Sequence, residues 1–224
     1  MNMSPELWER MFAALNEGLW VSLSLIVPSA FLGFWGGVVI GSARVFAPRP
    51  IKKIADAFVA LFRGVPLLLQ LYFLYYALPG WGISFTAYQA AVIGFVLCSA
   101  AYQSEYIRGA LLSIRTGQIR AAEALGFSRL QMVTTIMIPQ ALRRALPGCG
   151  NEIIYLIKYS SLAHVVTCME LTGQARQVSM RSFDYFETYI TVGIYYLALT
   201  TLAAWFLRWL EGRIAVPGFG SKAE

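Results

Sequence analysis

Long apolar runs are the feature that most limits what this chain can fold into. A helix needs roughly 20 predominantly apolar residues to cross a bilayer, and five runs meet that length. They lie at about residues 19–43, 54–78, 86–111, 141–165 and 186–208, and the fourth is weaker and more polar than the others. The composition agrees, because 58% of the 224 residues are apolar and 13% are charged, against about 45–50% and about 25% in soluble domains. The sequence therefore predicts an all-α membrane protein with about five spanning helices.

The distribution of basic residues predicts the orientation of these spans. Arginines and lysines gather in the loop after the first span, in the loop after the third, and in the C-terminal residues, whereas residues 79–86 carry no charge. Basic residues collect in cytoplasmic loops, so we expect residues 1–16 to be a periplasmic segment and residues 213–224 a cytoplasmic tail. The membrane domain is then expected at 17–212. This distribution accounts for the net charge of +6, and no basic patch is interleaved with aromatics as a nucleic-acid site would require.

The N-terminal residues do not read as a cleaved signal peptide. Glu6 and Glu9 stand where such a peptide carries basic residues, and the apolar run that follows is longer than its hydrophobic region. The first span is therefore expected to remain in the mature chain.

Several kinds of chemistry find no support in the sequence. None of the lysines follows a glycine, so the GK[ST] signature of a phosphate-binding loop is missing. Cys98, Cys149 and Cys168 form no CxxC pair and have no histidines near them, which argues against a metal site or a disulfide framework. The single histidine, His164, is more often a packing residue in such apolar surroundings than a base. We expect no catalytic residue, no metal and no cofactor in this chain.

The loop between the third and fourth spans, about residues 115–144, is the most informative segment. A short helix containing Ala121 and Ala122 is expected to end at Gly126, a natural terminator, and Ser128 can cap the next helix. Pro139 is expected to break or bend that second helix. Small alanines let another protein approach closely, with flanking arginines pairing with its acidic rim. An ordinary solvated helical hairpin explains the same residues.

The ordered pattern AA-x3-G-x9-I-x2-P, formed by Ala121, Ala122, Gly126, Ile136 and Pro139, resembles the EAA loop of ABC importer permeases. The wider segments FRGVPLLLQLYFLYYALPG, SEYIRGALLSIRTGQ and IPQALRRALPGCGNEIIYLIKYSSL resemble the polar amino-acid permease family, of the histidine and glutamine permease type. The resemblance covers nearly the whole chain, about residues 17–212.

This resemblance implies a type I ABC importer permease fold of the MetI-like kind, in the cell inner membrane. It implies a subunit that translocates a polar amino acid, driven by a separate ATPase subunit dimer that binds ATP and Mg. A second permease, identical or paralogous, and a periplasmic substrate-binding protein would complete the complex. The alternative is a membrane scaffold or channel-like subunit that is not coupled to ATP, but it leaves the ordered motif unexplained.

The chain departs from the family pattern at two places. Arg120 stands where the motif has glutamate, so any role of that carboxylate is absent or moved to Glu123. Relatives commonly carry an aspartate where this chain has Tyr159, which suggests a different substrate or a paralogue that holds the site. The residues expected to couple to the ATPase are Arg120, Ala121, Ala122, Glu123, Gly126, Ile136 and Pro139.

Glu152 is the leading candidate for the substrate pathway. An ionisable residue at membrane depth costs about 2.5–3.5 kcal/mol on insertion scales, so it usually faces a cavity or a partner. Tyr159 lies seven residues later, on the same helix face. The alternative is an ion pair of Glu152 with Lys158 or with another span.

Arg63 would also lie inside a span unless Gly64 and Pro66 break the helix there, and a broken helix leaves free backbone groups beside a cavity. Gln70 and Gln103 are further polar candidates for the pathway. Glu105 and Arg108, three residues apart, are expected to pair with each other.

Overall fold

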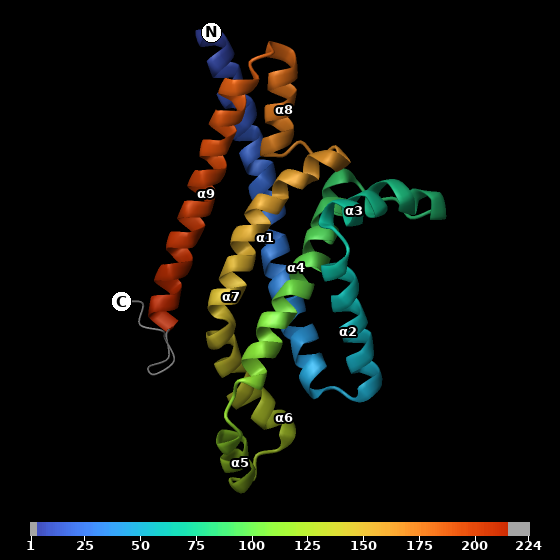
Figure 1. The fold of residues 1–224 in the computed structure, drawn as a ribbon, viewed down its shortest axis with the longest axis vertical. Helices are drawn as coiled ribbons and strands as arrows, with labels where there is room; N and C mark the ends of the chain where they lie inside the picture. The colour runs from blue at the N-terminus through green and yellow to red at the C-terminus, as the bar shows by residue number, and fades with distance from the viewer. Residues whose placement is uncertain (1–3, 215–224) are drawn as a thin grey trace.

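The computed structural model describes residues 4–214, and helices with short connections make up that whole range. The elements, in chain order, are α1 (Pro5–Phe46), α2 (Arg49–Gly64), α3 (Leu67–Tyr72), the π-helical turn η1 (Phe73–Ala77), the 3-10 turn η2 (Leu78–Trp81), α4 (Ala87–Leu112), α5 (Thr116–Ala124), α6 (Arg129–Gln131), the π-helical turn η3 (Met132–Met137), α7 (Ile138–Tyr159), the 3-10 turn η4 (Ser160–Val166), α8 (Leu171–Ser182) and α9 (Tyr185–Ile214). They form an elongated bundle with α8 beside the start of α1 at one end and α5 and α6 at the other (Figure 1).

The contact between α1 and α4 forms the centre of the bundle. Small residues let the two backbones approach closely, because a Cβ added at Gly33 would lie 2.7 Å from the Ser99 Oγ. A Cβ at Gly37 would overlap that of Gln103. This is the small-residue packing by which membrane helices associate, and it makes α1 and α4 one tightly joined unit.

Three of the described helices are long and apolar enough to cross a membrane, judged by length and composition: α1, α4 and α9. They correspond to the spans expected at 19–43, 86–111 and 186–208. At 42 residues, α1 is about 63 Å long at 1.5 Å per residue, more than a bilayer needs. Its first turns are residues 5–16, which the sequence had suggested as a separate segment.

The span expected at 54–78 is not one straight helix, and the break considered at Gly64 and Pro66 is present. The axis turns by 102° between α2 and the segment that begins with α3. Pro66 disfavours helical geometry at the residue before it, and Val65 is indeed extended, with φ −99° and ψ 131°. The chain therefore builds a broken span or a re-entrant loop here.

One side chain satisfies the carbonyl groups that this break leaves free. Nε2 of Gln70 donates hydrogen bonds to the carbonyl oxygens of Phe62, at 3.0 Å, and Val65, at 2.8 Å. The last carbonyls of a helix have no partner inside the helix, so Gln70 stabilises the bent geometry.

The span expected at 141–165 is divided between α7 and η4. Among the described residues, α7 is not one of the helices that pass the length and composition criteria for a span. The number of five spans, and their orientation, therefore stay predictions.

Of the two outcomes expected at Pro139, a break or a bend in the helix before α7, the structure excludes the break. Helical structure runs without interruption from Arg129 to Tyr159, and Pro139 lies in the first turn of α7. The π-helical turn η3 directly precedes it, and a π turn is one way for a helix to accommodate a disturbed hydrogen-bond pattern. Proline lacks an N–H group. The π-helical turn accommodates it, so the helix continues past Pro139.

The expected loop at about 166–185 contains the helix α8, and Glu170 stabilises the start of that helix by hydrogen bonds. The Glu170 carboxylate accepts hydrogen bonds from the backbone N–H groups of Thr172 and Gly173 and from the Tyr196 hydroxyl of α9, at 2.8, 2.9 and 3.0 Å. Burial raises the pKa of Glu170 to about 7, although these hydrogen bonds act to lower it. The N–H of Leu171 donates to Ser22 Oγ of α1, so α8 is tied to both α1 and α9.

Candidate substrate path and coupling surface

A cavity of about 370 Å³ opens at the bend between α2 and α3. Its walls come from the end of α2, the start of α3, the middle of α4 and the end of α7. Arg63, Pro66, Cys98, Tyr102 and Tyr159 are among the residues that line it. Two of the residues expected on the pathway, Arg63 and Tyr159, are thus brought together by elements far apart in the sequence.

Arg63 lies against α4 at the edge of this cavity. Its guanidinium carbon is 5.2 Å from the ring centre of Tyr102, within the range of a cation–π interaction. Its Nη1 lies 2.8 Å from Glu105 Oε1, and its side chain is 41% exposed. The guanidinium is therefore held in place, yet remains accessible from the cavity.

Glu105 is the centre of a charge cluster that joins three helices. The expected pair with Arg108 is confirmed, with Nε 3.2 Å from Glu105 Oε2, but it is one of three. Arg44 of α1 places Nη1 3.1 Å from Glu105 Oε1 and Nε 2.7 Å from Asp56 Oδ1 of α2. We refer to Arg44, Asp56, Arg63, Glu105 and Arg108 as the charge cluster.

Glu152 is buried inside the bundle rather than at the cavity wall. Its side chain is 3% exposed, and its Oε1 has no hydrogen-bond partner among the described residues. The alternative of an ion pair with Lys158 or with another span is not what the structure shows, because no salt bridge within residues 4–214 includes Glu152. Glu152 is thus a buried acid without a salt-bridge partner in the described part of the chain.

The two glutamines serve the packing of the fold. Gln70 supports the break after α2, as described above. Gln103 is fully buried between α1, α4 and α7, and its Nε2 lies 3.4 Å from the carbonyl oxygen of Cys149. Neither glutamine lines the cavity at the bend.

A second cavity, of about 310 Å³, lies between α4 and α7 on the side of α5. Glu105, Ser113 and Arg144 are among its lining residues. Nη1 of Arg144 donates to the carbonyl oxygen and the hydroxyl of Ser113, at 2.8 and 2.9 Å. Ser113 caps the C-terminus of α4, so this cavity reaches the start of the loop that contains α5 and α6.

That loop forms the helical hairpin that the sequence predicted. Gly126 has φ +80°, and the N–H groups of Gly126 and Phe127 donate to the carbonyls of Glu123 and Ala122, a Schellman ending. Ser128 caps α6 in a reciprocal arrangement with Gln131. Both local predictions, the glycine terminator and the serine cap, are confirmed.

The hairpin surface differs from the surface that the motif alone suggests. Arg120, Ala121 and Glu123 are exposed, but Ala122 is 3% exposed and packs inside the chain. Ile136 is half-buried in η3, and Pro139 is exposed.

Three large apolar residues project from the hairpin and were missed by the sequence reasoning: Leu125, Phe127 and Leu130, which are 78%, 38% and 73% exposed. Their position on both sides of the helix-terminating Gly126 was the available signal. Exposed apolar groups gathered in this way mark an interaction site.

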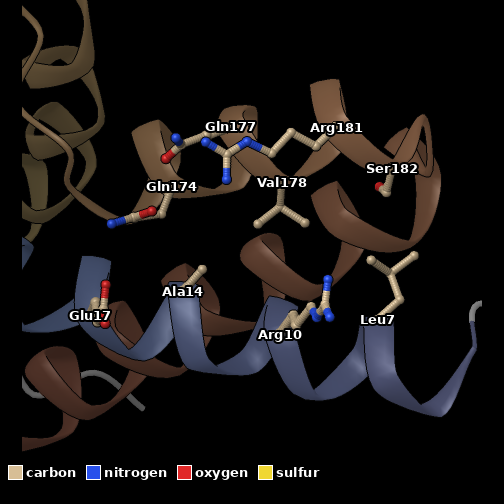
Figure 2. Close-up of a pocket in the computed structure, with 9 residues that line it drawn as sticks. All are labelled: Leu7, Arg10, Ala14, Glu17, Gln174, Gln177, Val178, Arg181 and Ser182. Atoms are coloured by element: carbon tan, nitrogen blue, oxygen red, sulfur yellow. The ribbon is translucent and has the colours of Figure 1, made fainter.

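A cavity of about 510 Å³ lies at the opposite end of the bundle, between α1 and α8. Figure 2 shows Arg10 and Glu17 on α1 facing Gln174 and Arg181 on α8. Within residues 4–214, neither arginine takes part in a salt bridge. The sequence reasoning placed no site here.

Long apolar helices around a bent, cavity-lining segment define a multi-pass membrane transport protein, and comparison with known proteins gives its family. Residues 21–216 match the family described as the binding-protein-dependent transport system inner membrane component. The chain belongs to this family.

Individual relatives and solved structures agree with this family assignment. The probable amino-acid ABC transporter permease protein YckA of Bacillus subtilis (strain 168) is 39% identical over 204 residues, covering 91% of this chain and 90% of the relative. The glutamine transport system permease protein GlnP of Escherichia coli (strain K12) is 35% identical over 213 residues, covering 89% of this chain and 97% of the relative. A crystal structure of an amino acid ABC transporter with histidines superposes with a TM-score of 0.86 at 30% identity, over 95% of this chain and 100% of the other.

The expected fold, that of type I ABC importer permeases, is confirmed. The chain is a transport subunit and not an enzyme, because ATP hydrolysis in such systems belongs to a separate ATPase component. The family also implies a substrate-binding protein as a partner.

Proposed function

We propose that this chain is the permease subunit of an ATP-driven importer that carries a polar amino acid across the cell inner membrane. The observation that carries the proposal is the cavity at the bend between α2 and α3, with the Arg63 guanidinium at its wall. Amino-acid permeases among the relatives support the substrate class.

One cation at the cavity wall and one buried acid in the bundle suit the two ends of an amino acid. Arg63 is the positive group at the wall, and a guanidinium forms strong, directional hydrogen bonds with a carboxylate. Glu152 is a buried acid with a free acceptor oxygen, suited to an ammonium group once the path opens in the assembled complex. Tyr102 and Tyr159 add ring faces and hydroxyl groups to the same wall.

The ATPase subunit, which would bind the ATP and Mg, is proposed to dock on the α5–α6 hairpin. Leu125, Phe127 and Leu130 supply exposed apolar surface, and Arg120 and Ala121 flank it. This surface replaces the missing motif glutamate with shape and apolar contact. Since Ala122 faces inward, it supports the hairpin rather than meeting the partner.

The periplasmic binding protein is proposed to meet the opposite end, at the cavity between α1 and α8 (Figure 2). Arg10 and Arg181 are exposed there without salt-bridge partners in the described chain, so acidic side chains of a soluble partner would suit them. A second permease, a copy of this chain or a paralogue, would complete the pathway, because alternating access in transporters uses paired halves.

Uptake by the reconstituted complex tests the substrate class. The permease, its ATPase subunit and its binding protein are placed in proteoliposomes with ATP and a mixture of labelled common L-amino acids. We expect ATP-dependent uptake, and Arg63→Gln is expected to reduce it about tenfold or more, since truncating one partner of a charge pair costs about 2–5 kcal/mol.

Lys158→Gln is the matched control, because it removes a cation that does not line the cavity; it is expected to keep uptake. No ATP-dependent uptake of the mixture by the unmodified complex would contradict the proposed function.

Docking of the ATPase is tested by Leu125→Asp with co-purification. The exposed side chain has no packing role to lose, so we expect a folded permease that no longer retains the ATPase. Leu112→Asp is the matched control, because Leu112 is 61% exposed and lies just before the hairpin. Full retention of the ATPase by the Leu125 variant would remove the hairpin tip from the docking surface.

A further inference from the structure

The Arg63–Glu105 contact joins residues that line two different cavities. Arg63 lines the cavity at the bend, Glu105 lines the cavity next to the coupling hairpin, and their side chains touch at 2.8 Å. An ion pair between α2 and α4 therefore lies between the wall of the proposed substrate site and the wall of the cavity beside the hairpin.

Glu105 can release Arg63 without losing all of its partners. Arg44 and Arg108 remain within 3.1 and 3.2 Å of its carboxylate oxygens. A partly buried carboxylate left without a partner would be costly, and the two remaining arginines remove that cost. Of the three contacts, the one with Arg63 is also the one in which the cation is most exposed, at 41% against 10% and 38%.

Arg63 can also exchange partners without becoming unpaired. Its guanidinium borders the cavity at the bend, where a substrate carboxylate would take the place of the Glu105 oxygen. One charge-assisted pair would replace another, so the exchange has a small net cost for the arginine.

The helix that carries Arg63 is lightly attached. Along the 16 residues of α2, the buried ones are Ala55 and Val59, and its C-terminal end is the bend at Gly64. Few buried apolar contacts characterise segments that move at low cost. Glu105, in contrast, belongs to the tightly packed α4.

We propose that Arg63 and Glu105 form a substrate-sensitive latch: the ion pair holds α2 against α4 in the resting state, and the carboxylate of the substrate opens it by replacing Glu105 at Arg63. The latch rests on the proposed function, because it requires a substrate carboxylate in the cavity at the bend. It restrains the resting conformation, so the partner ATPase stays slow until substrate arrives. Opening shifts the population toward conformations that the ATPase can close on.

Basal ATP hydrolysis by the reconstituted complex, measured without binding protein or substrate, tests the latch. In Glu105→Gln the amide cannot form the ion pair with Arg63, and we expect basal hydrolysis to rise about fivefold or more, the lower end of typical coupling between sites. Arg63→Gln, whose native side chain is 41% exposed, is expected to show the same rise. If the Glu105→Gln permease does not assemble with the ATPase subunit, the Arg63→Gln variant alone tests the latch.

Glu211→Gln is the control. It makes the same acid-to-amide change on α9, outside the charge cluster, lines neither cavity, and is expected to leave basal hydrolysis unchanged. A purely structural role for Glu105 would lower hydrolysis and uptake in proportion, and that result overturns the latch. Unchanged basal hydrolysis in both latch variants overturns it as well.

The same preparation separates failure of the latch from failure of the proposed function. Absence of any ATP-dependent amino-acid uptake by the unmodified complex contradicts the function. Normal uptake by the unmodified complex, combined with unchanged basal hydrolysis in both variants, contradicts the latch alone.

Discussion

The α1–α4 pair and the helix α2 are neighbours, yet they are held in opposite ways. Between α1 and α4, glycines such as Gly33 and Gly37 leave no room for a Cβ, so backbone packs on backbone. In α2 the buried residues are Ala55 and Val59, and charged side chains join the helix to α1 and α4. The difference indicates a rigid frame of α1 and α4 and a helix α2 that can move against it.

The largest effect is expected from filling the α1–α4 contact. Gly37→Leu would force a side chain into Gln103 and Ser104, and overpacking a tight contact typically costs about 1–3 kcal/mol or more. We expect loss of monodisperse protein on size-exclusion chromatography in detergent. Gly64→Leu is the control in α2, where an added Cβ meets nothing within 4 Å, and it should purify normally. Equal behaviour of the two variants would remove the contrast between the frame and α2.

A smaller effect is expected where the bend is held. Gln70→Met keeps the size of the side chain but removes two hydrogen bonds, to the carbonyls of Phe62 and Val65. Leaving buried acceptors unsatisfied costs about 1–3 kcal/mol, so the melting temperature should fall by several degrees, and uptake should fall with it. Gln177→Met, at a half-buried position on α8, is the control for the melting temperature alone. An unchanged melting temperature for the Gln70 variant would mean that the bend is held by other contacts.

The smallest effect is expected at Glu170, beside α8, where the stability of the fold should depend on pH. Burial raises the pKa of Glu170 to about 7, above the ordinary value of about 4.3 for an unfolded chain. The folded state therefore binds more protons between these values, and stability should be greatest below about pH 4 and decline as the pH rises through about 7. We expect a melting temperature a few degrees higher at pH 5.5 than at pH 8.

Glu170→Gln removes the titrating group and should abolish that difference. If the melting temperature of the variant keeps the same pH dependence, a titrating group other than Glu170 is responsible.

Much of the fold was predictable from the sequence because the bilayer imposes a length and composition that can be read directly. The helices α1, α4 and α9 correspond to expected apolar runs, and Gly126 and Ser128 end and begin helices through local chemistry. The π turn before Pro139 was not predictable, since it depends on how the surrounding helix packs.

The candidate site was predictable only in part, because its decisive contacts join residues distant in the chain. The short-range pair of Glu105 with Arg108 follows from helix spacing, whereas its pair with Arg63 spans 42 positions. Gln103 was an expected pathway residue, but its burial between helices and its contact with Cys149 depend on tertiary packing. Hydropathy identifies which residues enter the membrane; it does not tell which of them face a cavity.

A distance measurement between spin labels tests the central claim that α2 moves against a fixed α1–α4 frame. One label pair joins Ile54 of α2 to Leu112 of α4, and the reference pair joins Val39 of α1 to Leu112; all three positions are exposed. Electron paramagnetic resonance on the reconstituted complex, with and without ATP, binding protein and the amino-acid mixture, gives both distances. The account predicts that the Ile54–Leu112 distance changes during turnover and that the Val39–Leu112 distance does not. Two unchanged distances, or two equal shifts, would contradict it.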